Sequence, residues 1–216
     1  KVLGGSGSIN AMVYTRGLES DYENWSSKTN NLWSWHNIKS SYEAIEKNIS
    51  KQDKTKIYNK IPVNDVSKFH HPIVQKFFEA SKEMGITVNK NLSTDSENQV
   101  GHYNINTRNG YRFTSSDGFL KPIMKSKNLI VFKNSIAKKI IFDHKKISQI
   151  LIINNGKEVS IKPNIGVILC TGAIMTPHLL MHSGIGPANK LKEVGIDVKI
   201  DSPNVGNHLQ DHIGID

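Results

Sequence analysis

The sequence predicts a mixed α/β fold, and three patterns support that prediction. An apolar segment over 165–170 has the composition of a strand buried on both faces. A short helix between glycine loops follows over 171–187, with Pro177 expected in its first turn. Another glycine loop, Gly4–Asn10, opens the sequence. A strand, a loop and a helix in this order are typical of α/β proteins that bind anionic ligands.

The first half of the chain predicts two helices separated by polar loops over 50–70 and 89–98. Behind Ser34, a favourable N-cap residue, apolar residues recur at steps of three and four: Trp35, Ile38, Tyr42, Ile45 and Ile49. The second helix should have Pro72 in its first turn and end at Gly85. One face of that helix would carry Ile73, Phe77, Ala80 and Met84.

The second half predicts short strands and one more helix. The strands are expected at 128–132, 136–142, 147–153 and 158–161, before the buried strand at 165–170. Asn154-Asn155-Gly156 predicts a hairpin turn. A helix over 188–194 should end at Gly195, and residues 196–200 should be extended.

The composition excludes several classes of protein. The 216 residues carry a net charge of +9, but only Arg16, Arg108 and Arg112 are arginine, and no basic run is interleaved with aromatics. Arginine forks favour phosphate and base recognition, so we predict no nucleic-acid partner. No segment approaches the roughly 18 apolar residues of a membrane span. The single cysteine, Cys170, rules out a disulfide framework and is predicted to be a buried structural thiol.

The two glycine loops predict a site for a nucleotide-like ligand. Glycine lets backbone N–H groups approach a phosphate closely, so we expect both loops to hold one ligand. The composition of Gly4–Ser8 also suits a flexible linker. Because the segment runs directly into Ile9–Met12, a native anion-binding loop is favoured.

Two other patterns do not predict a site. His208 and His212 have a spacing that could bind a metal on a helix, but no third ligand is evident. Ser183, Asp211 and His212 could be assembled into a triad, but Ser183 does not lie in a Gly-x-Ser-x-Gly turn. We therefore predict neither a metal site nor a nucleophilic serine.

Long stretches of the chain resemble the glucose–methanol–choline (GMC) family of flavin oxidoreductases, and its insect-type members above all. The first stretch comprises Gly4–Asn10, Met12, Tyr14, Arg16-Gly17 and the acidic-aromatic run 21–25. The second runs from Gly172 through Thr176-Pro177 and Ser183–Pro187 to Leu209–His212. A third, weaker stretch is Gly110–Leu120, with Arg112, Thr114, Ser115 and Phe119. The resemblance covers essentially the whole chain.

The resemblance implies a partial FAD-binding, Rossmann-like domain with part of a substrate-binding α+β domain. Residues 1–16 and 129–216 would belong to the FAD-binding domain, and 17–128 would lie on the substrate side. The implied reaction oxidises the CH–OH group of a small alcohol or sugar, with hydride transfer to non-covalently bound FAD. The implied FAD contacts are Gly4, Gly5, Ser6, Asn10, Ala11, Met12, Val13, Ala137, Thr171, Gly172 and Ala173, with the backbone of Ala137 against the adenine.

The chain also departs from the family pattern. Gly7 stands where the family usually has a second small hydroxyl residue. The family's Gly-x-Gly-x-x-Gly fingerprint would precede Lys1, and its catalytic histidine would follow Asp216, so we expect an internal fragment that is inactive alone. Two alternatives stay open: a non-catalytic GMC-like binding or structural module, and another flavoenzyme with two dinucleotide-binding domains. Secretion is common among insect members, but the leader is not in view.

Overall fold

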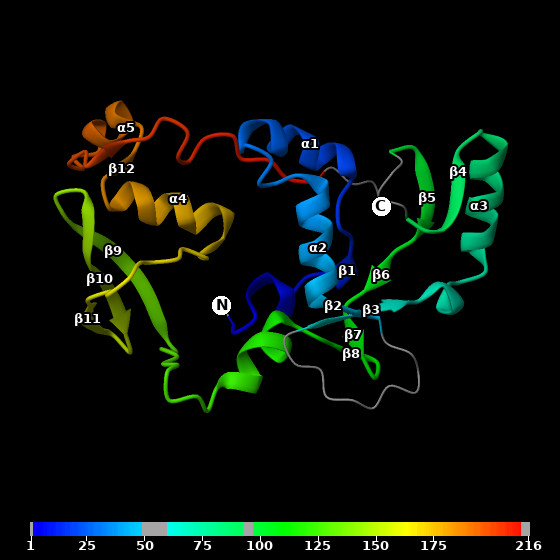
Figure 1. Ribbon diagram of the computed structural model, residues 1–216, viewed down its shortest axis with the longest axis horizontal. Coiled ribbons are helices and arrows are strands. Elements are labelled where there is room, and N and C mark those ends of the chain that lie inside the picture. Colours follow the sequence, from blue (N-terminus) through cyan, green and yellow to red (C-terminus); the bar gives the residue numbers. More distant parts are fainter. Residues whose placement is uncertain (1, 49–59, 93–96, 213–216) are drawn as a thin grey trace. The chain divides into compact units, whose positions relative to one another are not determined.

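The computed structural model describes residues 2–48, 60–92 and 97–212, which divide between two compact units, 1–129 and 130–216 (Figure 1). Ile49, residues 50–59 of the predicted loop 50–70 and residues 93–96 of the predicted loop 89–98 lie outside the described residues. The described parts of these two segments are not loop throughout, because they contain strand β3 (Ile61–Asp65) and the end of strand β4 (Thr87–Asn91). None of the described helices is long and apolar enough to cross a membrane.

Unit 1 combines three helices with short strands. The helices are α1 (Glu19–Lys28), α2 (Trp35–Ile45) and α3 (Ile73–Glu83). The strands are β1 (Val13–Tyr14), β2 (Glu46–Asn48), β3 (Ile61–Asp65), β4 (Thr87–Asn91), β5 (Gln99–His102), β6 (Asn104–Ile105), β7 (Thr107–Arg108) and β8 (Tyr111–Arg112). One sheet has the order β1-β6-β3-β2, while β4–β5 and β7–β8 form separate pairs.

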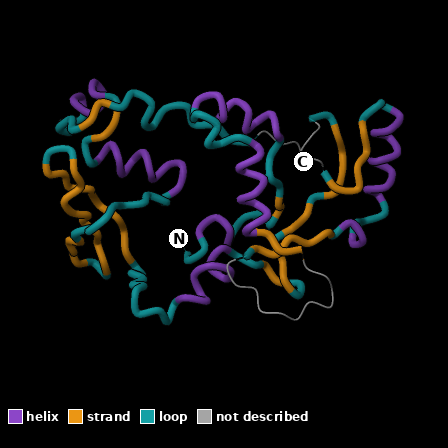
Figure 2. Tube along the Cα trace, viewed as in Figure 1, coloured by secondary structure: helices purple, strands orange, loops and turns teal. Residues whose placement is uncertain are grey.

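The two helices predicted for unit 1 form. Ser34 is the N-cap of α2, which ends at Ile45 because the chain turns into strand β2. Pro72 precedes α3, and Gly85 follows it with a φ of 77°. Aromatic rings join α1 to α2: Tyr22 is buried, with its ring centroid 5.4 Å from that of Trp35. The tubes of Figure 2 show these two helices side by side within the unit.

The apolar face predicted for α3 is not the face that packs. Ile73, Phe77 and Met84 are 65%, 59% and 77% exposed. The packed side lies one residue further along: Ser81 is buried, and the Phe78 ring stands edge-on to His102 at 5.0 Å. The packed side is less apolar than the exposed one, so the helical period of the apolar residues favours the wrong face.

Unit 2 contains a three-stranded antiparallel meander with helices beside it. Its order is β11-β10-β9, formed by β9 (Ser135–Asp143), β10 (Lys146–Asn154) and β11 (Lys157–Ile161). Helix α4 (Gly172–His182) packs against β9 (Figure 1). Strand β12 (Ile185–Gly186), helix α5 (Ala188–Glu193) and strand β13 (Ile200–Asp201) follow, and β12 pairs with β13 in parallel.

The predicted hairpin turn and both helices of unit 2 are confirmed. Asn154 pairs with Lys157, and the two residues between them, Asn155 and Gly156, have φ of 48° and 79°. Two positive φ angles are the mark of the tight turn that Asn-Gly favours. Pro177, expected in the first turn of α4, instead lies inside the helix, which already begins at Gly172.

Two predicted strands do not form. Residues 165–170 are neither strand nor helix, and Ile165 and Ile168 are 104% and 90% exposed. Residues 128–132 are likewise irregular. A strand needs hydrogen-bonding neighbours, and no strand of the described chain pairs with either segment. Cys170 is consequently exposed, not buried.

Ser183 links α4 to the meander. Ser183 is only 3% exposed. Its hydroxyl donates to the Leu179 carbonyl (2.6 Å) and accepts from the Ile140 N–H (2.9 Å).

Ser183→Ala should leave the buried Ile140 N–H unpaired, which costs about 1–3 kcal/mol. We expect faster hydrogen exchange at that amide in the full-length protein. Ser160→Ala, at an exposed hydroxyl bonded to Gln149, is the control; equal protection in both variants would contradict the link.

Candidate functional site

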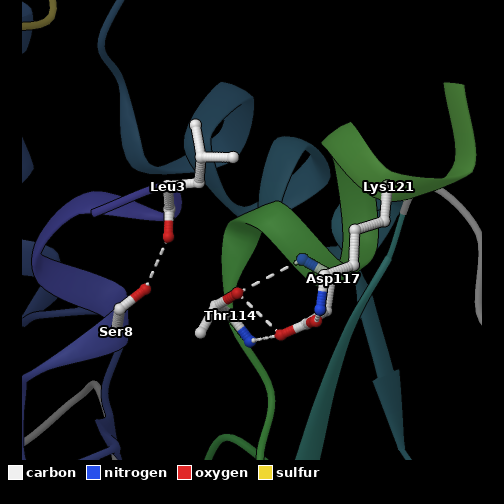
Figure 3. Close-up of polar contacts among 5 residues, drawn as sticks. All are labelled: Leu3, Ser8, Thr114, Asp117 and Lys121. Atoms are coloured by element: carbon white, nitrogen blue, oxygen red, sulfur yellow. Dashed lines mark hydrogen bonds and ion pairs between the residues drawn. The ribbon is translucent and has the colours of Figure 1, made fainter. Parts of the chain in front are cut away.

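The Gly4–Asn10 segment forms a tight loop that depends on glycine. Gly4 and Gly5 have φ of 94° and 58°, in the left-handed region that favours glycine. A short 3₁₀ turn over Gly5–Ser8 follows, and the Asn10 N–H closes it on the Ser6 carbonyl at 2.9 Å. The Ser8 hydroxyl donates to the Leu3 carbonyl at 2.9 Å (Figure 3). The chain therefore folds back on itself over about one turn, with Gly4 at the bend.

The loop rests on a turn from the third family-like stretch. A Cβ atom added to Gly4 would lie 2.5 Å from the Ser8 Oγ and 3.2 Å from the Thr114 Oγ1. Thr114 is held by Asp117, whose Oδ2 accepts bonds from the Thr114 N–H (2.8 Å) and hydroxyl (2.6 Å), as Figure 3 shows. The Ser115 hydroxyl donates to the Gly4 carbonyl at 3.3 Å. A side chain at Gly4 would therefore have to displace the Ser8 hydroxyl, and Thr114 leaves little space on the other side.

The predicted flavin-contacting segment, Asn10–Val13, contains a strained residue that the sequence did not reveal. Met12 has a φ of 63°, which is uncommon for a residue with a long side chain. Its N–H donates to the Asn10 Oδ1 (3.1 Å), and its carbonyl accepts from the Asn106 N–H (2.9 Å). Backbone strain of this kind clusters at ligand sites, where the surrounding bonds maintain it.

The remaining predicted contacts lie in unit 2. Thr171, Gly172 and Ala173 open α4, and Gly172 has a φ of 92° with no atom within 4 Å of an added Cβ. The Thr171 hydroxyl is hydrogen-bonded to that of Thr176, and no side chain of the described chain caps the helix. The N–H groups of the first turn therefore stay available to an anion. Ala137 lies on β9, an edge strand of its sheet, so the outer side of this strand has no strand partner in the described chain.

The structure thus brings Gly4, Gly5, Ser6, Asn10, Ala11, Met12 and Val13 together in unit 1, and holds Ala137 and Thr171–Ala173 in unit 2. Each of these two groups of residues is described within its own unit. That both groups bind the same ligand therefore stays a prediction. No atom lies within 4 Å of a Cβ added to Gly5 or to Gly172, so the backbone at each position leaves room for a phosphate group of the cofactor to approach closely.

The discounted patterns have simple structural explanations. Residues 207–212 are not helical, and His208 has a φ of 59° with its ring bonded to Asn204, so the helical spacing of His208 and His212 does not exist. No group of three or more metal-binding side chains occurs in the described ranges. The hydroxyl of Ser183 is buried in the link between α4 and β9.

A partly buried ion pair supports the segment that follows the loop. The Glu46 carboxylate accepts hydrogen bonds from the Tyr14 hydroxyl and from the Nε and Nη2 of Arg16. The distance from the Arg16 Nε to the Glu46 Oε1 is 2.8 Å. Burial raises the pKa of Glu46, but the bonds from Arg16 and Tyr14 outweigh it and hold the pKa below its usual value. Burial, with the bond to Glu46, raises the pKa of Tyr14. The Glu46 side chain is only 11% exposed, so this charge depends on its partners.

Comparison with known proteins identifies the family. The family model described as GMC oxidoreductase matches residues 1–214. This chain belongs to the GMC oxidoreductase family. It is 34% identical over 220 residues to "Alcohol dehydrogenase [acceptor]" of Pseudomonas putida, covering 100% of this chain and 40% of the relative. It is also 34% identical to "Oxygen-dependent choline dehydrogenase" of Brucella anthropi, over 100% of this chain and 39% of that protein.

A solved structure has a similar fold. The crystal structure of pyridoxine 4-oxidase from Mesorbium loti matches with a TM-score of 0.82 and 26% identity, over 92% of this chain and 40% of that one. The family assignment confirms the predicted fold class and FAD as the cofactor. The chain spans about 40% of the length of the GMC relatives it matches.

Proposed function

We propose that this chain is the cofactor-binding part of a GMC enzyme that oxidises the CH–OH group of a small alcohol or sugar. The family match over residues 1–214 carries the proposal. The names of the two bacterial relatives, an alcohol dehydrogenase and a choline dehydrogenase, support an alcohol as substrate. FAD would accept the hydride from the alcohol carbon.

We further propose which part of the cofactor each group of residues in this chain binds. Gly4, Gly5 and Ser6 would present backbone N–H groups to the pyrophosphate, and Asn10–Val13 would orient the flavin. Gly172 and Ala173, at the start of α4, would stabilise phosphate charge through the helix dipole. Residues 1–16 and 129–216 would form one discontinuous FAD-binding domain. The general base is proposed to lie outside this chain, as the resemblance to the family implies.

The shared length with the relatives supports the proposal that this chain is one part of a longer enzyme. The closer resemblance to insect members of the family stays a prediction, because the two relatives named above are bacterial. The absence of a nucleic-acid partner likewise stays a prediction.

The test uses the full-length protein. We expect it to be purified with bound flavin and to lose its visible flavin absorbance when a small alcohol is added without oxygen.

Gly172→Val should yield protein with little flavin, because a β-branched residue is unfavourable at a φ of 92° and would fill the space beside the helix start. Bound flavin that no alcohol or sugar reduces would favour the non-catalytic module. Full flavin content in Gly172→Val would contradict the role of that loop.

A further inference from the structure

Arg112 ties together two points of the glycine loop. Its Nη1 donates to the Asn10 Oδ1 at 2.6 Å and to the Gly7 carbonyl at 3.3 Å. These partners lie 102 and 105 residues away in sequence. One guanidinium therefore bridges the middle and the end of the segment proposed to hold FAD.

The bridge continues into the strained residue. The Asn10 Oδ1 that accepts from Arg112 also accepts from the Met12 N–H at 3.1 Å. A hydrogen bond from a charged donor is about twice as strong as a neutral one, so Arg112 fixes the rotamer of Asn10. A fixed Asn10 side chain in turn holds Met12 at its φ of 63°.

Arg112 is supported by a short hairpin. Arg112 lies on β8, which is joined to β7 by the tight turn Asn109-Gly110, with φ of 52° and 79°. Asn106 connects this hairpin to the loop: its carbonyl accepts from the Phe113 N–H (3.1 Å), and its N–H donates to the Met12 carbonyl (2.9 Å). The hairpin and the segment around Met12 are thus bonded through both backbone and side chain.

We propose that Arg112 is a positioning residue that fixes the cofactor loop through Gly7 and Asn10 and thereby sets how the flavin is held. The inference rests on the proposed binding of FAD to this loop. Arg112 does not need to touch the cofactor in this role. Its effect passes through Asn10, so removal of either residue should disturb the same geometry.

The experiment measures FAD binding to the full-length apoprotein of the Arg112→Met, Asn10→Ala and double variants. We expect Arg112→Met to raise the Kd for FAD about tenfold or more, as the loss of a charge-assisted bond implies. The double variant should lose clearly less than the product of the two single losses, since both remove one shared bond. The visible circular dichroism of bound flavin, recorded at saturating FAD, should change in Arg112→Met, whereas a loss of stability alone would leave it unaltered.

Lys82→Met is the charge control, because it removes one positive charge from an exposed position on α3 and should leave the Kd within about twofold. If Arg112→Met does not fold, Arg112→Gln, which keeps a hydrogen-bond donor without charge, takes its place and should show a coupling to Asn10 of the same sign but smaller size. Independent, multiplicative losses or an unchanged flavin spectrum would overturn the inference while the proposed function stands. A wild-type protein that binds no FAD would overturn both.

Discussion

Gly4→Ala is expected to release FAD from the full-length protein, with a Kd at least about thirtyfold higher. A side chain at a φ of 94° costs about 1–2 kcal/mol in backbone strain. The new Cβ would also lie 2.5 Å from the Ser8 Oγ, so Ser8 would have to give up its bond to the Leu3 carbonyl. Thr114 closes the other side, and it is held by Asp117. The loop would therefore have to change shape, and each 1.4 kcal/mol lost is a factor of ten in affinity.

Two alanine variants separate the causes. Gly7→Ala lies in the same loop, but its Cβ would have its nearest neighbour, the Ser115 nitrogen, at an ordinary 3.9 Å, so we expect at most about a threefold loss. Gly85→Ala introduces a positive-φ alanine at the end of α3, where nothing lies within 4 Å, and tests backbone strain alone. Titration of each apoprotein with FAD measures the three affinities. Equal affinities for Gly4→Ala and Gly7→Ala would argue that this loop is not the binding site.

Glu46→Ala is expected to lower the free energy of unfolding by about 2–3 kcal/mol at neutral pH. The substitution leaves Arg16 as a cation that is only 26% exposed and removes the acceptor of the Tyr14 hydroxyl. The Tyr22 hydroxyl donates to the Arg16 carbonyl at 2.5 Å. A displaced Arg16 should therefore also disturb the packing of α1 on α2. Urea unfolding of the full-length protein, followed by the fluorescence of the tryptophans on and beside these helices, gives the measurement.

The same residue predicts a dependence on pH. The folded-state pKa of Glu46 lies below its usual value, so its contribution to stability is complete above about pH 4.3, the ordinary glutamate pKa. The contribution should disappear as the pH falls through the lowered, folded-state pKa. The stability difference between wild type and Glu46→Gln should therefore shrink in acid. Glu79→Gln, at an exposed ion pair with Lys76, should produce no measurable change at neutral pH. A difference for Glu46→Gln that stays constant down to strongly acidic pH would contradict the ion pair.

Elements with a strong local signal could be predicted from the sequence. The Asn155-Gly156 turn, the strands of the meander and helices α2, α4 and α5 all formed where the pattern placed them, within a few residues. The backbone preferences of glycine, asparagine and β-branched residues act over a few neighbours, so sequence is sufficient there. The family signatures have the same local character, which is why they could be recognised without a structure.

Features that depend on distant partners could not be predicted. The apolar segment 165–170 has the composition of a buried strand, but a strand forms only where another chain segment pairs with it. The packed face of α3 is decided by β4 and β5, to which the sequence of the helix gives no clue. Cys170 was expected inside an apolar strand and is exposed because that strand does not form.

The sequence by itself therefore determined the family, the cofactor and the glycine-dependent loops, since each is written in a short run of residues. Only the tertiary structure decided what holds the first of those loops in place. The bond from Arg112 to Asn10 spans 102 residues, and the pairing of Arg16 with Glu46 spans 30. The reason is physical: side-chain hydrogen bonds and buried charges are satisfied by whichever group the fold brings within reach, and that group need not be near in the sequence.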